Sequence, residues 1–236
     1  MPRLINPEEY QQKRGEILDA AQKLIYTKGY EQMSVQDILI ELGISKGAFY
    51  HYFDSKQSLI EALVERMMTE MEYFLRPITD DPNIPALTKF EKFFDGIAKW
   101  KSARKAFLSQ LLHIWYTDDN AILRQKVTAA GGKWMSPFMA QIIEQGVNER
   151  VFDVFTIEET AKVIISMMMS MGENAAILML KIEPDFDDPH REEIMQEIEK
   201  TVIAYRNSIE RVLGAKPGSI MLFNLDVFRD WIFSAD

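Results

Sequence analysis

The amino-acid sequence contains no cysteine among its 236 residues. This absence excludes a disulfide framework, thiolate zinc sites and a cysteine nucleophile, and it fits the reducing cytoplasm. The first residues, 1–14, lack the apolar core that a signal peptide needs. Hydrophobic residues make up 47% of the chain, which is enough for a substantial core. We therefore expect a globular, cytoplasmic protein.

Motifs for catalysis and for metal binding are also lacking. The three histidines, His51, His113 and His190, are too far apart to form a metal-binding spacing with one another. The acidic stretch 185–193 lacks the glycine and the ligand order of a calcium loop, and acids before Pro189 favour a helix start instead. Neither a G-x-S-x-G nucleophile motif nor a phosphate-binding loop occurs. The sequence thus predicts no enzyme activity, no metal site and no cofactor.

Long apolar runs are nearly absent as well. The longest, residues 161–180, approaches the length of a membrane span. Gly172, Glu173 and Asn174 interrupt it, and polar groups within lipid are costly. We expect this run to form a buried helix and the protein to have no membrane partner.

Positive charge is scarce, since the formal net charge is −9. Residues 1–56 nevertheless contain seven Lys or Arg against eight Asp or Glu, so most of the negative charge lies further along the chain. Phosphate contacts supply most nonspecific affinity for nucleic acid. Any DNA contact must therefore come from a few well-placed residues, which predicts modest electrostatic steering and a shallow salt dependence.

Alternation typical of β-strands is also almost absent, whereas helical spacing recurs throughout the chain. Apolar residues from Ile17 to Ile25 follow the period of a helix, and Gly29 stands where a helix would end. The sequence therefore predicts an all-α fold.

The next segment has the layout of a helix-turn-helix. Ser34 is placed to cap a short helix over 35–42, and Gly43 would end that helix. Ser45 can then cap a second short helix. A short helix, a glycine turn and a second short helix are the arrangement with which many proteins read DNA.

Aromatic side chains are concentrated in the second of these helices. Phe49 and Phe53 are four residues apart, so they share one helix face and are predicted to pack into the core. An outer set lies on the opposite face or its edges, where small residues allow close approach to bases and hydroxyls reach phosphates. This set, with a cation at the start of the following helix, comprises Gly47, Ala48, Tyr50, His51, Tyr52 and Lys56. Taken alone, the outer aromatics could equally be interfacial residues of any helical protein.

The whole segment from Ser34 to Leu59 has a recognisable pattern of residues. The residues that form this pattern are Ser34, Asp37, Ile38, Gly43, Ile44, Ser45, Lys46, Gly47, Phe49, Tyr50, Tyr52, Phe53, Ser55, Lys56 and Leu59. This pattern resembles the DNA-binding domain of the TetR/AcrR family of bacterial transcriptional regulators. The resemblance covers about residues 10–66 and implies a helix-turn-helix DNA-binding domain there. It also implies that residues 67–236 form a helical effector-binding and dimerisation domain.

The resemblance implies roles for individual residues. In the family, the position of Ser34 caps a helix on the phosphate backbone, the segment 46–50 enters the major groove, and the positions of Tyr50, Tyr52 and Lys56 hold phosphates. His51 occupies a variable position, so both a groove contact and a bystander role stay open. Leu39 and Leu42 depart from the alanine that is frequent in the family. The expected DNA-binding residues are Ser34, Ser45, Lys46, Gly47, Ala48, Tyr50, His51, Tyr52 and Lys56.

The remaining chain is predicted to contain long helices near 87–101, 103–116, 120–146, 157–182 and 189–213. Pro77, Pro82 and Pro85 are expected to end the helix that precedes them and to mark the domain boundary. The last long helix has apolar residues at spacings of three and four, as in a coiled-coil seam. We expect a homodimer interface there, with an internal face of a monomer as the alternative. The predicted interface residues are Ile194, Ile198, Val202, Tyr205 and Ile209.

Large apolar residues between the long helices are candidates for an effector pocket, although any helical core contains such residues. Arg124 and His113 are the polar groups that could bind the head of an effector. The apolar tail, 215–236, is expected to dock on the body or on a partner subunit. The predicted pocket residues are Trp100, Phe107, Leu111, Trp115, Trp134, Phe138 and Met168.

These features together predict a dimeric transcriptional regulator that binds double-stranded operator DNA. A repressor released from a palindromic operator by a small-molecule effector is the expected mode. Two alternatives stay open at this stage: a DNA-binding dimer that no small molecule controls, and a transcriptional activator.

Overall fold

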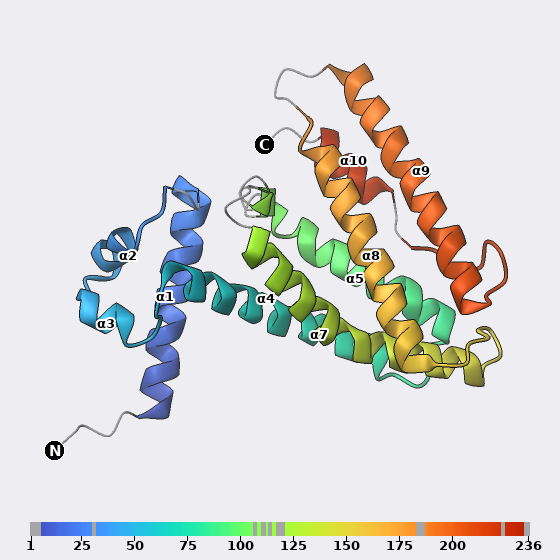
Figure 1. The fold of residues 1–236 in the computed structure, drawn as a ribbon, viewed down its shortest axis with the longest axis horizontal. Coiled ribbons are helices and arrows are strands. Elements are labelled where there is room, and N and C mark those ends of the chain that lie inside the picture. Colours follow the sequence, from blue (N-terminus) through green and yellow to red (C-terminus); the bar gives the residue numbers. More distant parts are fainter. Residues whose placement is uncertain are drawn as a thin grey trace. The chain divides into compact units, whose positions relative to one another are not determined.

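The computed structural model describes residues 6–29, 32–105, 108–109, 112, 115–116, 121–182, 187–222 and 225–233. Within these ranges the regular secondary structure is entirely helical (Figure 1), which confirms the all-α prediction. The chain divides into two compact units. Unit 1 comprises Met1–Thr69 and Ala106–Val127, and unit 2 comprises Glu70–Lys105 and Thr128–Asp236. The segment predicted to bind DNA thus belongs to unit 1.

Unit 1 contains α1 (Pro7–Lys28), α2 (Val35–Leu42), α3 (Lys46–Tyr50) and the start of α4 (Lys56–Thr79). Helix α2 has the predicted bounds, and α3 begins directly after its predicted cap but ends at Tyr50, before Phe53. Ser34 caps α2, Gly43 follows it in the left-handed conformation, and Ser45 caps α3. Gly29 likewise follows the last residue of α1, and its N–H donates to the Ile25 carbonyl.

The core of unit 1 forms where these four helices meet. Phe49 is completely buried and Phe53 is nearly so, which confirms that their shared face points inward. Leu39 is buried in this core and Leu42 packs against it, so both leucines are accommodated. The other buried residues are Ile17, Leu18, Ala20, Ala21, Leu24, Ile25, Met33, Ile38, Leu59, Ile60, Ala62 and Leu63.

Helix α4 ends at Thr79, before Pro82 and Pro85 as predicted, but Pro77 itself does not stop it. Pro77 lies within the last turn, where its missing N–H costs one hydrogen bond and few residues follow. The end of α4 is stabilised from α5. The buried Lys89 ammonium donates to the Thr79 carbonyl at 2.5 Å, a favourable position for a cation beside a helix C-terminus.

Unit 2 is built from long helices. It contains the end of α4, α5 (Ala86–Ser102), most of α7 (Ala121–Asn148), α8 (Ile157–Met179), α9 (Asp188–Leu213) and α10 (Asp226–Phe233). Asp187 caps α9 by accepting a hydrogen bond from the His190 N–H, which confirms the predicted helix start. The helix predicted near 103–116 falls partly outside the described residues.

Helices α8 and α9 lie side by side (Figure 1). The apolar row of α9 faces into unit 2, and Ile198 is 0% exposed within the single chain. Tyr205 is half-buried, and its hydroxyl is 2.8 Å from Ser170 Oγ and accepts from Asn174 on α8. Ile194, Ile198, Val202 and Ile209 are thus buried within the single chain, as the alternative of an internal face has it, and their assignment to a dimer interface stays a prediction.

Helix α8 is the one described helix that is long and apolar enough to cross a membrane, a test that the core helix of a soluble protein also passes. One face, including Ile164 and Met168, is buried in unit 2. Only 28% of its most apolar stretch is buried within the chain, however. The predicted burial of this run is thus correct for one side of α8 and wrong for the other.

The described part of the tail docks on the body of unit 2, which is the first of the two predicted alternatives. Helix α10 packs against α5 and α9 (Figure 1). Trp231 Nε1 donates to Ser102 Oγ at 3.3 Å, and Arg229 pairs with Glu192 at 3.0 Å. Ile232 is fully buried beneath the helix.

Candidate nucleic-acid interface

The turn between α2 and α3 is set by Gly43. Its φ of +61° lies in the left-handed region, which glycine adopts without strain. The Gly43 N–H donates to the Ile40 carbonyl, and the Ile44 N–H donates to the Leu39 carbonyl at 3.1 Å. These bonds satisfy the end of α2 and redirect the chain into α3. The two helices thereby form the compact helix-turn-helix that the sequence predicts.

The start of α2 is held by a reciprocal capping arrangement. The Asp37 N–H donates to Ser34 Oγ at 3.1 Å, while the Ser34 N–H donates to Asp37 Oδ2 at 2.8 Å. Lys28, in the last turn of α1, pairs with Asp37 Oδ1 at 2.7 Å. The Lys28 ammonium and the Ser34 donors hold the pKa of the Asp37 carboxyl well below its ordinary value. The cap thus ties α2 to α1.

This cap should make the stability of unit 1 depend on pH in the acidic range. The folded-state pKa of Asp37 is lowered, so its ionised carboxyl stabilises unit 1 fully above the ordinary Asp pKa of about 3.9. This stabilisation is lost as pH falls towards the folded-state pKa. We expect Asp37→Asn to be less stable than the wild type at pH 7, with the difference shrinking below about pH 4. Urea unfolding across this pH range tests it. A difference independent of pH would contradict the assigned ionic contribution.

Helix α3 presents small and polar groups to solvent. Ser45 Oγ accepts a hydrogen bond from the Ala48 N–H at 3.1 Å and caps the helix. Lys46 and Gly47 are exposed, whereas Ala48 is half-buried. The Lys46 ammonium lies 5.9 Å from the centre of the Tyr50 ring. The outer side of α3 therefore combines one cation, one exposed phenol and a stretch of backbone that bulky side chains do not cover.

The aromatic side chains around α3 divide into two layers. The Tyr50 ring, 43% exposed, packs edge-on against buried Phe49 with centroids 5.3 Å apart, so its position is supported from the core. His51 is exposed at the end of α3, and Tyr52 is half-buried against the core. Of the nine predicted DNA-binding residues, Ser34, Ser45, Lys46, Gly47, Tyr50 and His51 are exposed, and Ala48, Tyr52 and Lys56 are half-buried.

This surface has the chemistry that DNA recognition requires. An ammonium and hydroxyls can bind phosphate oxygens, and an imidazole can donate to or accept from base edges. The small residues at the start of α3 permit close approach to the bases. Lys46 and Lys56 are the two cations among the nine predicted residues, in keeping with the near-neutral charge of residues 1–56.

The predicted pocket residues are distributed over both units. Trp100, Phe138 and Met168 are buried in unit 2, and Trp134 Nε1 donates to Glu72 Oε2 at 3.3 Å in the same unit. Trp115 instead packs against the core of unit 1. Phe107 and Leu111 lie outside the described residues, as does His113.

Arg124 is engaged within unit 1. Its guanidinium donates to the Trp115 carbonyl at 2.5 Å and lies 5.4 Å from the centre of the Tyr116 ring. These contacts give Arg124 a structural role in tying the start of α7 to the residues before it. They do not support the suggestion that it binds the head of an effector.

Unit 2 has a cavity of about 750 Å³ between α7 and α8. Its walls combine apolar side chains with charges of both signs, and none of the predicted pocket residues belongs to the lining. The lining residues are Gly132, Lys133, Ser136, Pro137, Ala140, Gln141, Glu144, Ile157, Glu158, Lys162, Ile165 and Ser166.

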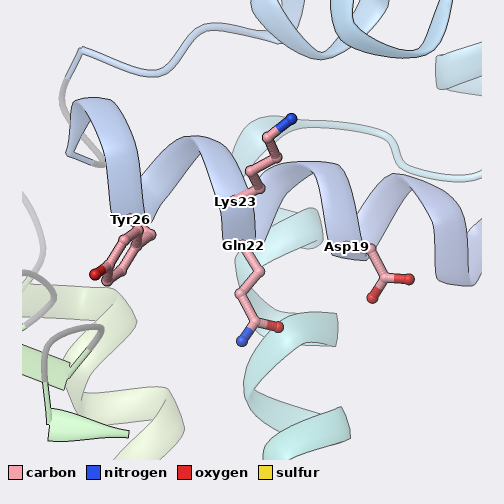
Figure 2. Close-up of a pocket in the computed structure, with 4 residues that line it drawn as sticks. All are labelled: Asp19, Gln22, Lys23 and Tyr26. Carbon is pink, nitrogen blue, oxygen red and sulfur yellow. The ribbon is translucent and has the colours of Figure 1, made fainter.

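A smaller hollow of about 380 Å³ lies along α1 in unit 1. Figure 2 shows that Asp19, Gln22 and Tyr26 extend from one side of the helix, whereas Lys23 points away from them. Arg66 of α4 donates to Asp19 Oδ1 and Gln22 Oε1, each at 2.6 Å. Two of the four lining residues are thus used in packing α4 against α1, while Lys23 pairs with Glu41 of α2 at 2.6 Å.

Sequence reasoning missed two features. The exposed apolar side of α8, with Val163 and Ile177, can be identified only once the buried side is known. The apolar composition of α8 on nearly all sides indicated that such a surface could exist. Tyr10 of α1 packs against His51 and Tyr52. These residues are far apart in the sequence, so no local pattern could predict the contact.

Comparisons with known proteins agree with this geometry. Residues 17–63 match the family described as bacterial regulatory proteins, tetR family. Residues 108–174 match the family described as tetracyclin repressor-like, C-terminal domain. The first match contains the whole helix-turn-helix, and the second covers much of α7 and α8.

Relatives and solved structures point the same way. HTH-type transcriptional regulator TtgR of Pseudomonas putida is 26% identical over 129 residues, which is 52% of this chain and 60% of the relative. HTH-type transcriptional repressor DhaR of a Mycobacterium species is 19% identical over 170 residues, or 72% of this chain and 83% of the relative. The match thus spans less than two-thirds of TtgR. Both relatives are named as regulators and not as enzymes.

The fold is shared with a transcriptional regulator from Cytophaga hutchinsonii. Its crystal structure aligns with a TM-score of 0.55 at 20% identity and covers 82% of this chain and 96% of that chain. At this identity the likeness concerns the fold alone.

Proposed function

This chain belongs to the TetR family of bacterial regulatory proteins, and from that premise we propose that it is a cytoplasmic, sequence-specific DNA-binding regulator of transcription. One observation carries the proposal. The outer side of α3 exposes Lys46, Gly47 and Tyr50 on a helix that buried Phe49 anchors in the core. Side chains exposed on a rigid support are suited to contacting a partner, because little ordering remains to be done on binding.

In the proposed complex, α3 lies in the major groove with its first residues towards the base edges. Lys46, Gly47, Ala48 and His51 read bases, while Ser34, Ser45, Tyr50, Tyr52 and Lys56 position the protein on phosphates. Selection of duplexes from a random pool by the purified protein tests the proposal. Enrichment of a two-fold symmetric sequence supports it, and binding without any sequence preference overturns it.

Two substitutions on the outer side of α3 should weaken this binding while leaving the protein folded. Lys46→Ala and Tyr50→Ala each remove a proposed contact to the DNA, so we expect affinity for the selected duplex to fall about tenfold or more. Lys46→Ala should also lower the slope of log affinity against log salt by about 1 if Lys46 contacts a phosphate as well as a base. Fluorescence anisotropy titrations at several salt concentrations measure both quantities.

Matched controls are available in unit 2. Lys99→Ala and Tyr73→Ala remove the same side chains from exposed positions on α5 and α4, and they should leave DNA binding unchanged. Full affinity in both α3 variants would show that DNA does not bind this side of α3.

We also propose a homodimer that forms through the outer face of α8 and the adjoining edge of α9. Val163 and Ile177 are 47% and 43% exposed and lie about four turns apart on the same side of α8. Val212 is also exposed, and Tyr205 joins the two helices. An apolar face that one chain leaves uncovered is stabilised when a second copy packs against it. The α3 helices of the two protomers would then bind half-sites about one DNA turn apart.

The regulator is further proposed to be a repressor that a small molecule releases from its operator. The name of the matched C-terminal family and that of DhaR support repression. The cavity between α7 and α8 lies within the usual size range of ligand pockets, about 300–1,000 Å³. A thermal-shift screen followed by operator titration tests this part. Ligands that raise the unfolding temperature and weaken operator binding support it, whereas stabilising ligands without effect on operator binding contradict it.

A further inference from the structure

Three aromatic rings, one from α1 and two from the residues that follow α3, meet at the surface of unit 1. The Tyr10 ring lies 4.8 Å from the Tyr52 ring with a tilt of 39°, and 5.7 Å from the His51 imidazole in an edge-on arrangement of 80°. His51 and Tyr52 are themselves edge-on at 5.0 Å. Every ring of this cluster thus contacts the other two, within the range of favourable aromatic pairs.

The cluster lies at the edge of the hydrophobic core, against which Tyr52 packs. His51 is exposed, and Tyr10 and Tyr52 are half-buried, whereas Phe49 and Phe53 fill the core beneath them. Tyr10 lies in the second turn of α1, and its N–H donates to the carbonyl of Asn6, the residue that caps this helix. A regular and capped helix therefore holds the Tyr10 ring against the end of α3.

We propose that Tyr10 is a positioning residue of the DNA-binding surface, which holds the His51 imidazole and the Tyr52 phenol in the orientation used to contact DNA. This inference rests on the proposed function. His51 ends α3, and its exposed side chain would otherwise sample several rotamers. Fixing a side chain before binding removes part of the entropy that the complex must overcome.

The position of Tyr10 also has a consequence for specificity. His51 is the proposed base contact in the cluster, and Tyr52 is the proposed phosphate contact. If Tyr10 orients the imidazole, its removal should relax sequence preference at the base pair that His51 reads, and it should do so without any direct contact between Tyr10 and DNA.

The test compares the full-length Tyr10→Ala and Tyr10→Phe proteins in titrations with the selected duplex and its single-base variants. We expect Tyr10→Ala to weaken binding about tenfold, and Tyr10→Phe, which keeps the ring, to weaken it less than about twofold. In a His51→Ala, Tyr52→Ala background, Tyr10→Ala should have no further effect, because the residues it acts through are gone. An equal loss in that background would overturn the inference, as would an equal loss for Tyr10→Phe.

A second readout needs no DNA. The ring protons of His51 should shift in the NMR spectrum of Tyr10→Ala and stay close to wild type in Tyr10→Phe, because the neighbouring ring shields them. Absence of any shift in Tyr10→Ala would overturn the inference. Wild-type titrations separate the two hypotheses: a wild type without sequence-specific binding removes the proposed function and this inference with it. If the wild type binds DNA specifically and Tyr10→Ala binds it equally well, the role of Tyr10 is contradicted but the proposed function is not.

Discussion

Replacing Phe49 with alanine is expected to unfold or loosen the helix-turn-helix and to abolish operator binding. Phe49 is 0% exposed, and its ring packs against Phe53 at 5.9 Å and Tyr50 at 5.3 Å. Removing a buried phenylalanine leaves a cavity and typically costs about 3–5 kcal/mol. Small domains are stable by only about 5–15 kcal/mol, so the loss is a large part of the total.

The adjacent residue provides the matched control for this prediction. Tyr50→Ala removes an aromatic ring of similar size from the next position of α3, where the ring is partly exposed. We expect Tyr50→Ala to unfold at nearly the wild-type urea concentration, and Phe49→Ala to unfold at a clearly lower one. Circular dichroism of the full chain monitors both. A Phe49→Ala protein of normal stability would mean that the inner and outer sides of α3 are exchanged.

Placing a charge on the outer face of α8 should separate the proposed dimer. Val163→Asp and Ile177→Asp each introduce a carboxylate into an apolar face that a second copy would bury. An unpaired buried charge is strongly unfavourable, so the dimer should dissociate. Because a monomer can engage only one half-site, operator affinity should fall about 100-fold or more. Analytical ultracentrifugation and anisotropy titration measure the two effects.

Ile203→Asp is the control for this experiment. Ile203 is an exposed apolar residue on α9 that lies about half a turn around the helix from Val212, away from the proposed interface. This variant should remain dimeric and bind the operator normally. Ile198→Asp is not a suitable probe, since Ile198 is buried in the protomer and the aspartate would destabilise the fold itself. A dimeric Val163→Asp and a dimeric Ile177→Asp would show that the outer face of α8 does not form the interface.

The helix-turn-helix shows how far local sequence can be interpreted. Ser34, Gly43 and Ser45 act on backbone groups within a few residues of themselves, so their roles as caps and as a turn could be predicted. The inward direction of Phe49 and Phe53 follows from helical spacing alone, and burial confirms it. The extension of α4 beyond Pro77 was not predicted, because a proline near a helix end is tolerated when few bonds depend on it.

By itself, the sequence determined the all-α class, the boundaries of α2, the start of α3, and the split of the aromatics in and after α3 into a buried and an outer set. Each depends on interactions within one or two helical turns. Only the tertiary structure decided that the apolar row around Ile198 is buried within the same chain, and that Tyr10 meets His51 and Tyr52. The physical reason is that hydrophobic spacing shows which side of a helix avoids water but carries no information about which surface covers it. That choice is made by packing between segments distant in the chain, where shape and burial must be satisfied together.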